Sequence, residues 1–347
     1  MPDPISEQIL ALEEHVKSVK LPQDLQDKVL DRLKRIGRMG GTPAAFDEVD
    51  RTADYADWIV NLPWEVHSED ILDLEHARRV LDRNHYGLAQ LKGRVLEFIS
   101  VLKLNQQAER SARAPVLCFV GLVGTGKTTI ASSIAEALGK KFVRIPFGGM
   151  GDPLDLRGQS KMHPEAEPGQ IIKSLRKIGV RNPVILIDEI DRVSEEGRSS
   201  IMGVLLELLD PEQNQAFADH YIDYPFDLSE VLFIATANNT TNISTAVLDR
   251  LEVLPMPSYT DEEKIIIGKE YMLPRIIKES GLEMGAVSLS DDVWPMIVRP
   301  LGYDAGMRSL ERTIEGIVRK IALGVVEGKL QKVSLTPENI KEYLTTY

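Results

Sequence analysis

Cysteine is almost absent from this sequence, which has a single one, Cys118, among its 347 residues. One cysteine excludes a disulfide within the chain, and its place in the apolar run PVLCFVG favours a small buried side chain over a reactive thiol. Long hydrophobic runs are missing as well, since none approaches the ~20 residues that a membrane-spanning helix needs. We therefore expect a globular protein without a membrane span.

Positive charge is in short supply, with 41 Lys and Arg against 53 Asp and Glu and a formal net charge of −12. Because neutralising phosphates requires a surplus of Lys and Arg, nucleic acid is not expected as the main partner, although a local basic patch stays open. No targeting signal is visible in this sequence. The acidic start MPDPISEQILALEE has neither an apolar signal core nor an Arg-rich character, and the end YLTTY is no address tripeptide.

The first part of the chain, residues 1–85, is predicted to be helical. Apolar residues spaced alternately four and three apart over 5–19 form a heptad pattern that requires a partner helix. A second helix is predicted over 22–37, and GGTPAAF at 40–46 is predicted to be a loop. Aromatic residues of the next block, 48–84, are interpreted as packing between helical pieces rather than as a stacking surface for bases.

Beyond this part, the pattern changes to alternating strands and helices, which predicts a parallel sheet covered by helices on both faces. The expected strands are 116–120, 142–145, 184–187, 231–235 and 252–254. After Pro257 the pattern becomes helical again. We therefore predict an α/β domain over 86–256 and a smaller helical domain over 257–347, in addition to the helical segment over 1–85.

The stretch GLVGTGKTT at 121–129 follows an apolar strand and precedes a helical stretch. It contains the GxxxxGK[ST] pattern of a phosphate-binding loop, in which backbone N–H groups and the N-terminus of a helix surround the phosphates of a nucleotide. Lys127 would neutralise charge, and the Thr128 hydroxyl would hold Mg²⁺. The candidate nucleotide-binding residues are Gly121, Leu122, Val123, Gly124, Thr125, Gly126, Lys127, Thr128 and Thr129.

A second strand supplies two carboxylates. VILIDE places Asp188 and Glu189 where an apolar strand ends, at the sheet edge where ligands bind in open α/β folds. Asp188 would order Mg²⁺ and its waters, and Glu189 would polarise an attacking water, which favours hydrolysis over phosphoryl transfer to another substrate. Such a pair alone is more often a helix start near solvent, but its occurrence together with the phosphate loop favours the functional interpretation.

Two further candidates keep alternatives open at this point. Asn238, at the end of VLFIATANN, either senses the γ-phosphate and orients the water or is only a turn former. Arg250, in AVLDRLEV, is either a surface charge or a finger that completes the site of a neighbouring subunit in a ring.

Seven stretches carry a more specific signal: GLVGTGKTT, FVRIPFGG, RGQ…EPGQIIKSL, NPVILIDEID, LLELLDPEQNQAFADHYIDYPFDLSEVLFIATANN, LDRLEV and GYDAGMRSLER. Together they strongly resemble the Lon protease family of AAA+ ATPases, from the N-terminal helices to near the end of the chain. GLVGTGKT, PFGGMGD and NISTAVLDR are most similar to the fungal peroxisomal branch. The resemblance therefore implies a location in the peroxisome matrix, with the mitochondrial matrix as the alternative.

The resemblance implies a P-loop NTPase fold of the AAA+ type, with an αβα core around a parallel sheet, a helical segment before it and a small α-helical lid after it. It implies ATP or ADP with Mg²⁺ as ligands and assembly into homohexameric rings. The implied roles are Asp188 and Glu189 as the Walker B pair, Asn238 as the first sensor, Arg250 as the finger acting on the adjacent subunit, Arg308 as the second sensor, and His85, Tyr86, Gly87 and Leu88 as the segment packing on the adenine.

Two departures from the family pattern stand out. Where the family usually presents an aromatic and an aliphatic residue to the central pore, this chain has His163 and Pro164, preceded by Met162. These residues either grip substrate polypeptide or form an ordinary polar loop. The stretch after Arg308 is too short for another sizeable domain, and nothing in it resembles the family's Ser-Lys peptidase unit. We therefore expect an ATPase module that unfolds and threads misfolded or tagged proteins without cleaving peptide bonds.

Two other classes of function compete with this interpretation. The missing [NT]KxD guanine-reading motif argues against a GTPase-type switch, and the Asp-Glu pair argues against a small-molecule kinase. The acidic balance argues against a DNA-remodelling or clamp-loading ATPase.

Overall fold

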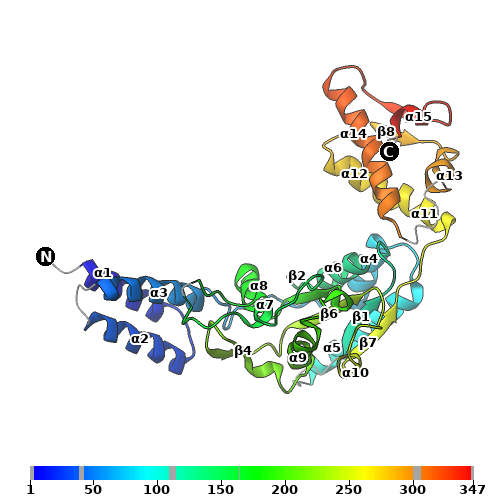
Figure 1. Cartoon of the computed structure of the whole chain (residues 1–347). Helices are drawn as coiled ribbons and strands as arrows, with labels where there is room; N and C mark the ends of the chain where they lie inside the picture. The colour runs from blue at the N-terminus through cyan, green and yellow to red at the C-terminus, as the bar shows by residue number, and fades with distance from the viewer. Residues whose placement is uncertain (1–3, 39–42, 109–114, 164, 300–305, 345–347) are drawn as a thin grey trace.

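The computed structural model describes residues 4–38, 43–108, 115–163, 165–299 and 306–344. Within these ranges, three regions follow one another along the molecule (Figure 1). A helical N-terminal region lies at one end, an α/β core lies in the middle, and a smaller region of helices, the lid, stands at the other end. The three regions confirm the αβα core flanked by N-terminal helices and a helical lid that the sequence indicated.

The N-terminal region consists of α1 (Pro4–Ser18), α2 (Gln23–Gly37) and α3 (Pro43–Val60). The heptad pattern is confirmed, because α1 packs against both α2 and α3. The buried side chains that join these helices include Ile9, Val16, Leu25, Val29, Leu33, Ile36, Val49 and Ile59. The predicted loop over 40–46 is wrong in its second half, since α3 begins at Pro43. Proline fits there because the first residue of a helix has no use for its N–H.

The core contains a parallel five-stranded sheet in the order β2-β3-β6-β1-β7. Its strands are β1 (Val116–Val120), β2 (Phe142–Pro146), β3 (Val184–Asp188), β6 (Leu232–Ala237) and β7 (Leu251–Pro255). Each predicted strand is confirmed to within about two residues at its ends. These runs were recognisable because both faces of the sheet are covered, so that the strands are apolar almost throughout.

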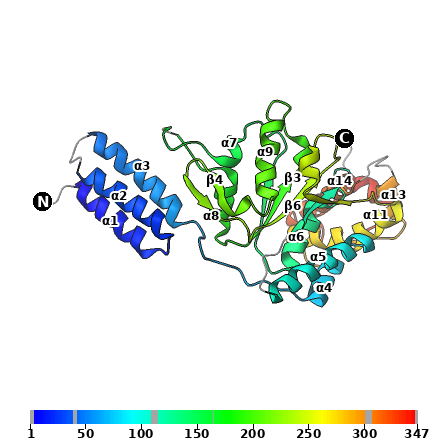
Figure 2. The same ribbon diagram turned by 90° about the horizontal axis from the view of Figure 1, so that it is seen from below.

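Helices cover both faces of this sheet (Figure 2). In β1, Leu117 and Phe119 pack with α4 (Leu74–Asn84), α5 (Ala89–Gln107) and α6 (Lys127–Ala137). Cys118 points to the opposite face, where the core includes residues of α8 (Gln170–Ile178) and α9 (Arg198–Leu209). The shorter helices are α7 (Leu154–Arg157), η1 (Ile190–Arg192), η2 (Asn214–Ala216) and α10 (Thr245–Leu248). Cys118 is the buried apolar side chain that the sequence indicated, and burial raises the pKa of its thiol to about 12.

A hairpin that the sequence analysis missed connects the core to the N-terminal region. It pairs β4 (Phe217–Asp219) with β5 (Tyr224–Phe226) in antiparallel fashion. The ring centroids of Trp64 and Phe226 lie 4.9 Å apart, so aromatic residues of 48–84 do pack within the protein, but against this hairpin rather than between helical pieces as the sequence analysis predicted. Tyr55 adds a hydrogen bond from its hydroxyl to the carbonyl oxygen of Ile222 at 2.7 Å.

The lid has a separate hydrophobic core, in which Trp294 is almost completely buried. Its elements are α11 (Asp261–Ile267), the π-helical turn η3 (Gly268–Met272), α12 (Leu273–Glu279), β8 (Val287–Leu289), α13 (Val293–Val298), α14 (Arg308–Val326), β9 (Val333–Leu335) and α15 (Ile340–Tyr343). The lid begins with a capping box, since Thr260 and Glu263 each accept a hydrogen bond from the other's backbone N–H. Among the described residues, no helix combines the length and the apolar character that crossing a bilayer requires.

Candidate functional site

The loop between β1 and α6 has the shape of a phosphate-binding loop. Gly124 and Gly126 have φ values of 84° and 93°, which side-chain-bearing residues rarely adopt. Lys127 is the first residue of α6, so the free backbone N–H groups at the start of this helix face the same space as the loop. Gly121 is required for a different reason, because a Cβ there would overlap the backbone carbonyl of Met256 at the end of β7.

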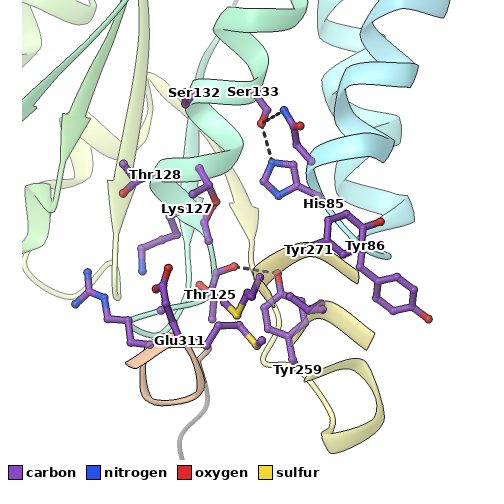
Figure 3. A pocket seen from close by; sticks show the side chains of 18 of the residues that line it. His85, Tyr86, Thr125, Lys127, Thr128, Ser132, Ser133, Tyr259, Tyr271 and Glu311 are labelled. Carbon is purple, nitrogen blue, oxygen red and sulfur yellow. Dashed lines mark hydrogen bonds between the residues drawn. The ribbon is translucent and has the colours of Figure 1, made fainter. Parts of the chain in front are cut away.

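A cavity of about 610 Å³ lies in front of this loop, between the core and the lid. We call the part formed by the loop and the strand ends the strand side; it comprises Val123, Gly124, Thr125, Gly126, Lys127, Thr128, Asp188, Glu189 and Asn238. We call the opposite part the helix side; it comprises Asn84, His85, Tyr86, Tyr259, Ile267, Glu270, Tyr271, Met272 and Arg275. Figure 3 shows Lys127 and Thr128 on one side of the cavity and the rings of Tyr86, Tyr259 and Tyr271 on the other.

Lys127 is the buried cation of the strand side. Its Nζ donates to the carbonyl oxygens of Gly121 at 2.6 Å and Leu122 at 3.0 Å, and to Oδ1 of Asn238 at 3.1 Å. Burial lowers the pKa of Lys127, while Asp188 and nearby carboxylates oppose that shift. The amide nitrogen of Asn238 is buried without a hydrogen-bond partner, so a donor next to Lys127 is free for an oxygen atom of a ligand.

The two predicted carboxylates are held by a hydroxyl from the neighbouring strand. Thr236 of β6 donates from Oγ1 to Oδ1 of Asp188, and the same Oγ1 accepts the backbone N–H of Glu189 at 2.9 Å. Oδ2 of Asp188 accepts from Nε of Arg144 at 2.6 Å. Glu189 has a left-handed backbone, with φ 59°, and its carboxylate lies 3.6 Å from the guanidinium of Arg192. The strand ends therefore aim both side chains at the cavity.

The residues present fit a magnesium ion only together with a phosphate-bearing ligand. Among the described residues, no group of three or more His, Cys, Asp or Glu is placed to hold a metal ion. Thr128 and Asp188 both line the cavity, however, and magnesium commonly takes one or two protein oxygens beside phosphate oxygens and water. Thr128 and Asp188 are thus sufficient as the protein ligands of such a site.

His85 and Tyr86 line the helix side, whereas Gly87 and Leu88 do not. These last two form the turn between α4 and α5, with φ values of 63° and 54°. The buried His85 ring joins this turn to α6 through a 2.9 Å hydrogen bond between Nε2 and the hydroxyl of Ser133 (Figure 3). Burial and, to a smaller degree, Lys92 lower the pKa of His85 to about 4.

The lid contacts the phosphate loop directly. The backbone N–H of Met307 donates to the carbonyl oxygen of Gly124 at 3.0 Å, and a Cβ on Gly306 would overlap the carbonyl of Val123. Arg308, the next residue and the first of α14, lines the cavity. A second link comes from Tyr259, whose hydroxyl donates to the carbonyl oxygen of Thr125 at 3.1 Å.

Several cavity residues were missed by the sequence analysis. Glu270 and Tyr271 come from the π-helical turn η3, and Arg275 forms an ion pair with Glu311 at the cavity wall. Only the π-helix itself, a rare element that often marks functional sites, would have drawn attention to η3, and it has no sequence signature.

Other predicted residues lie away from the cavity. The side-chain guanidinium of Arg250 pairs with Asp210 at 2.9 Å, and Arg250 does not line the cavity of its own chain. A backbone N–H from Glu212 is the main reason why the pKa of Asp210 is lowered, and Arg250 adds to it. Met162 and His163 are exposed in the loop before α8, and Pro164 lies outside the described residues.

The remaining predicted residues belong to the phosphate loop and its flanks. Thr129 lines the cavity, whereas Gly121 and Leu122 contribute only the carbonyl oxygens that bind Lys127.

Comparison with known families agrees with this geometry. Residues 117–256 match the ATPase family associated with various cellular activities (AAA). Residues 278–333 match the Lon protease AAA+ ATPase lid domain. The two matched ranges coincide with the core and with most of the lid, so these parts of the chain are similar to the AAA+ ATPase core and the lid of Lon proteases.

Curated relatives extend the similarity to the N-terminal helices. Lon protease 2 of Herpetosiphon aurantiacus is 42% identical over 342 residues, which cover 99% of this chain and 41% of the relative. Lon protease 2 of Thermus thermophilus is 44% identical over 95% of this chain and 42% of its own length. Lon protease of Dictyoglomus thermophilum is 42% identical over 99% of this chain and 42% of its own. The chain thus spans about two fifths of the length of these relatives.

Proposed function

We propose that this Lon-type module binds ATP with Mg²⁺, hydrolyses it, and uses the hydrolysis to unfold and thread protein substrates. The observation that supports the proposal most is the direct contact between the lid and the phosphate loop, Met307 to Gly124, beside the carboxylates of Asp188 and Glu189. A change at the phosphates can reach the lid through this contact without any intermediate residue.

In this proposal the strand side performs the chemistry. Lys127 and the N–H groups at the start of α6 bind the phosphates, and the free amide nitrogen of Asn238 donates to the terminal phosphate or to the attacking water. Glu189 orients and polarises that water. When bound through Thr128 and Asp188, magnesium supplies positive charge against the phosphate oxygens.

The helix side recognises the nucleoside in this proposal. Tyr86 provides an aromatic face for the base, and His85 fixes the turn that carries Tyr86. His85 is held neutral near pH 7 by its lowered pKa, so it positions the turn without adding charge. Arg308 reaches the cavity from the lid and, as a second sensor, would report the phosphate state to α14.

We further propose that Arg250 acts on the cavity of an adjacent subunit in a homohexameric ring. Its position outside its own cavity and its half-exposed side chain support this role. The exposed residues Met162 and His163, together with Pro164, which follows them in the sequence, would grip misfolded or tagged proteins in the pore. ATP turnover per subunit that does not rise with protein concentration would contradict a shared site.

A location in the peroxisome matrix, with the mitochondrial matrix as the alternative, is a further proposal. It is supported by the three stretches that resemble the fungal peroxisomal branch. Fluorescence microscopy of the tagged full-length protein against markers of both organelles tests it.

The decisive test of the hydrolytic assignment is the Glu189→Gln variant. We expect it to bind ATP about as tightly as the unmodified protein and to hydrolyse it at least about 100-fold more slowly, because the amide cannot polarise water as the carboxylate does. Steady-state phosphate release and nucleotide binding are measured side by side. Equal turnover of the two proteins would refute the role of Glu189.

A further inference from the structure

Asp188 has an arginine partner that no motif indicated. Arg144 lies in β2, two positions before Pro146, which is the residue paired with Asp188 of β3. Because side chains alternate along a strand, Arg144 and Asp188 lie on the same face of the sheet. Their side chains meet there, with Nε of Arg144 2.6 Å from Oδ2 of Asp188.

The two partners differ in their access to water. The side chain of Asp188 is 4% exposed, whereas that of Arg144 is 51% exposed. A buried carboxylate left without a partner would strongly destabilise the folded chain, so Asp188 needs a cation or donors on both oxygens. Thr236 provides the donor for Oδ1, and Arg144 provides the cation for Oδ2.

Lys127 does not provide that cation. It lies close enough for Asp188 to influence its pKa, but its Nζ is directed at two carbonyl oxygens and Asn238. A divalent cation that contacts Oδ2 of Asp188 therefore comes next to the guanidinium of Arg144, and the two positive charges repel each other. The exposed half of the Arg144 side chain gives the guanidinium a path into solvent by rotation about its own bonds.

We propose that Arg144 is an internal counter-cation of Asp188, which neutralises this carboxylate while no divalent cation is bound and competes with that cation for Oδ2. The inference rests on the proposed function, because it assigns the same carboxylate to magnesium. Arg144 is a positioning residue: it sets the magnesium concentration at which the nucleotide site fills, and it does not itself line the cavity.

The test compares Arg144→Gln with Arg192→Gln, which removes the same charge from the partner of Glu189 instead. Binding of a fluorescent ADP is measured as a function of free Mg²⁺. We expect the half-saturating Mg²⁺ concentration to fall about fivefold in Arg144→Gln, a factor typical of losing one partly exposed ion pair, and less than about twofold in Arg192→Gln.

A second readout is the melting temperature of the ADP-bound protein, with and without a divalent cation. In ADP and a chelator, Arg144→Gln should melt at a lower temperature than the unmodified protein, and Mg²⁺ or Mn²⁺ should restore part of the difference, because the cation takes the place of the lost arginine. If Arg144→Gln does not fold, Arg144→Lys is used, which keeps a charge but not the planar donor, and the Mg²⁺ shift should be smaller and in the same direction.

Unchanged Mg²⁺ dependence in Arg144→Gln, with ADP still bound, would overturn the role of Arg144 alone. An equal shift in both variants would also overturn it, since the cause would then be net charge rather than contact with Asp188. If the unmodified protein binds no fluorescent ADP at any Mg²⁺ concentration, the proposed function itself falls, and the inference falls with it.

Discussion

The strand side and the helix side of the cavity are built in different ways. The strand side uses one continuous loop and the ends of neighbouring strands, and its Lys127 and Asp188 are buried and hydrogen-bonded to the core. The helix side is assembled from the α4–α5 turn, the linker residue Tyr259 and η3, which lie far apart in the sequence. The strand side is therefore complete within the core, whereas the helix side is complete only while the lid is in place.

The largest expected effect tests whether the strand side depends on its buried cation. Lys127→Met should lower ATP turnover at least about 100-fold, because a preorganised positive group next to the phosphates is lost. Lys140→Met is the matched control: Lys140 is also buried, but it pairs with Asp70 away from the cavity. It should reduce stability and leave nucleotide affinity unchanged. Equal loss of turnover in both variants would show that turnover depends on any buried lysine and not on the position of Lys127 next to the phosphates.

The next effect tests the contact that joins the two sides. Gly306→Ala places a Cβ against the carbonyl of Val123, so the lid should move away from the phosphate loop and turnover should fall about tenfold. Gly93→Ala in α5 meets nothing within 4 Å and serves as the control. Turnover and ADP affinity are measured for both. A Gly306→Ala protein with normal turnover would mean that the lid contact is dispensable.

A smaller effect is expected on the helix side. Tyr86→Ala should weaken binding of ATP and ADP about tenfold alike, through loss of an aromatic face for the base, with little change in turnover at saturation. Tyr271→Phe keeps its ring and loses only the 3.3 Å hydrogen bond to the carbonyl of Asp82, so it should change affinity less than about twofold. Loss of turnover at saturating ATP in Tyr86→Ala would contradict the division between the two sides.

The last expected effect is a loss of folding stability through His85, which is absent at neutral pH and grows as the pH falls. The pKa of His85 is about 4 in the folded protein and 6.5 in the unfolded chain, so the unfolded chain binds the extra proton as the pH falls below 6.5. The neutral His85 ring therefore makes its full contribution to the free energy of unfolding above pH 6.5. This contribution decreases as the pH falls towards 4, and at pH 5 it is smaller by about 2 kcal/mol. Urea unfolding at pH 7.5 and 5 should show a smaller pH dependence in His85→Asn. An unchanged dependence would assign the acid sensitivity to other groups.

The strands and the phosphate loop could be predicted from the sequence because their signals are local. Val116–Val120 and Val184–Asp188 are apolar runs that end in turn or acidic residues, and the loop after β1 needs its glycines in fixed places. The helical spacing of α1 and α2 was readable for the same reason, whereas the start of α3 at Pro43 was not, since proline also marks loops.

Contacts between distant segments could not be predicted in the same way. Arg144 and Thr236 meet Asp188 only because β2, β3 and β6 are neighbours in the sheet, an order that no short motif specifies. The hairpin β4–β5 has strands too short for an alternating pattern. The pairing of Arg250 with Asp210 is likewise a product of the fold: the residues alone left a choice between a surface charge and a finger, the family resemblance implied the finger, and neither indicated Asp210.

The left-handed backbone of Glu189 makes the carboxylate at this position costly for folding stability. Most residues with a side chain are strained in this conformation, at a cost of roughly 1 kcal/mol, and glycine or asparagine would reduce the strain. Substitution of Glu189 by either of these two residues would thus stabilise the fold and remove the carboxylate. The glutamate found here therefore keeps a carboxylate at the strand end at a cost in stability, as the proposed function would require.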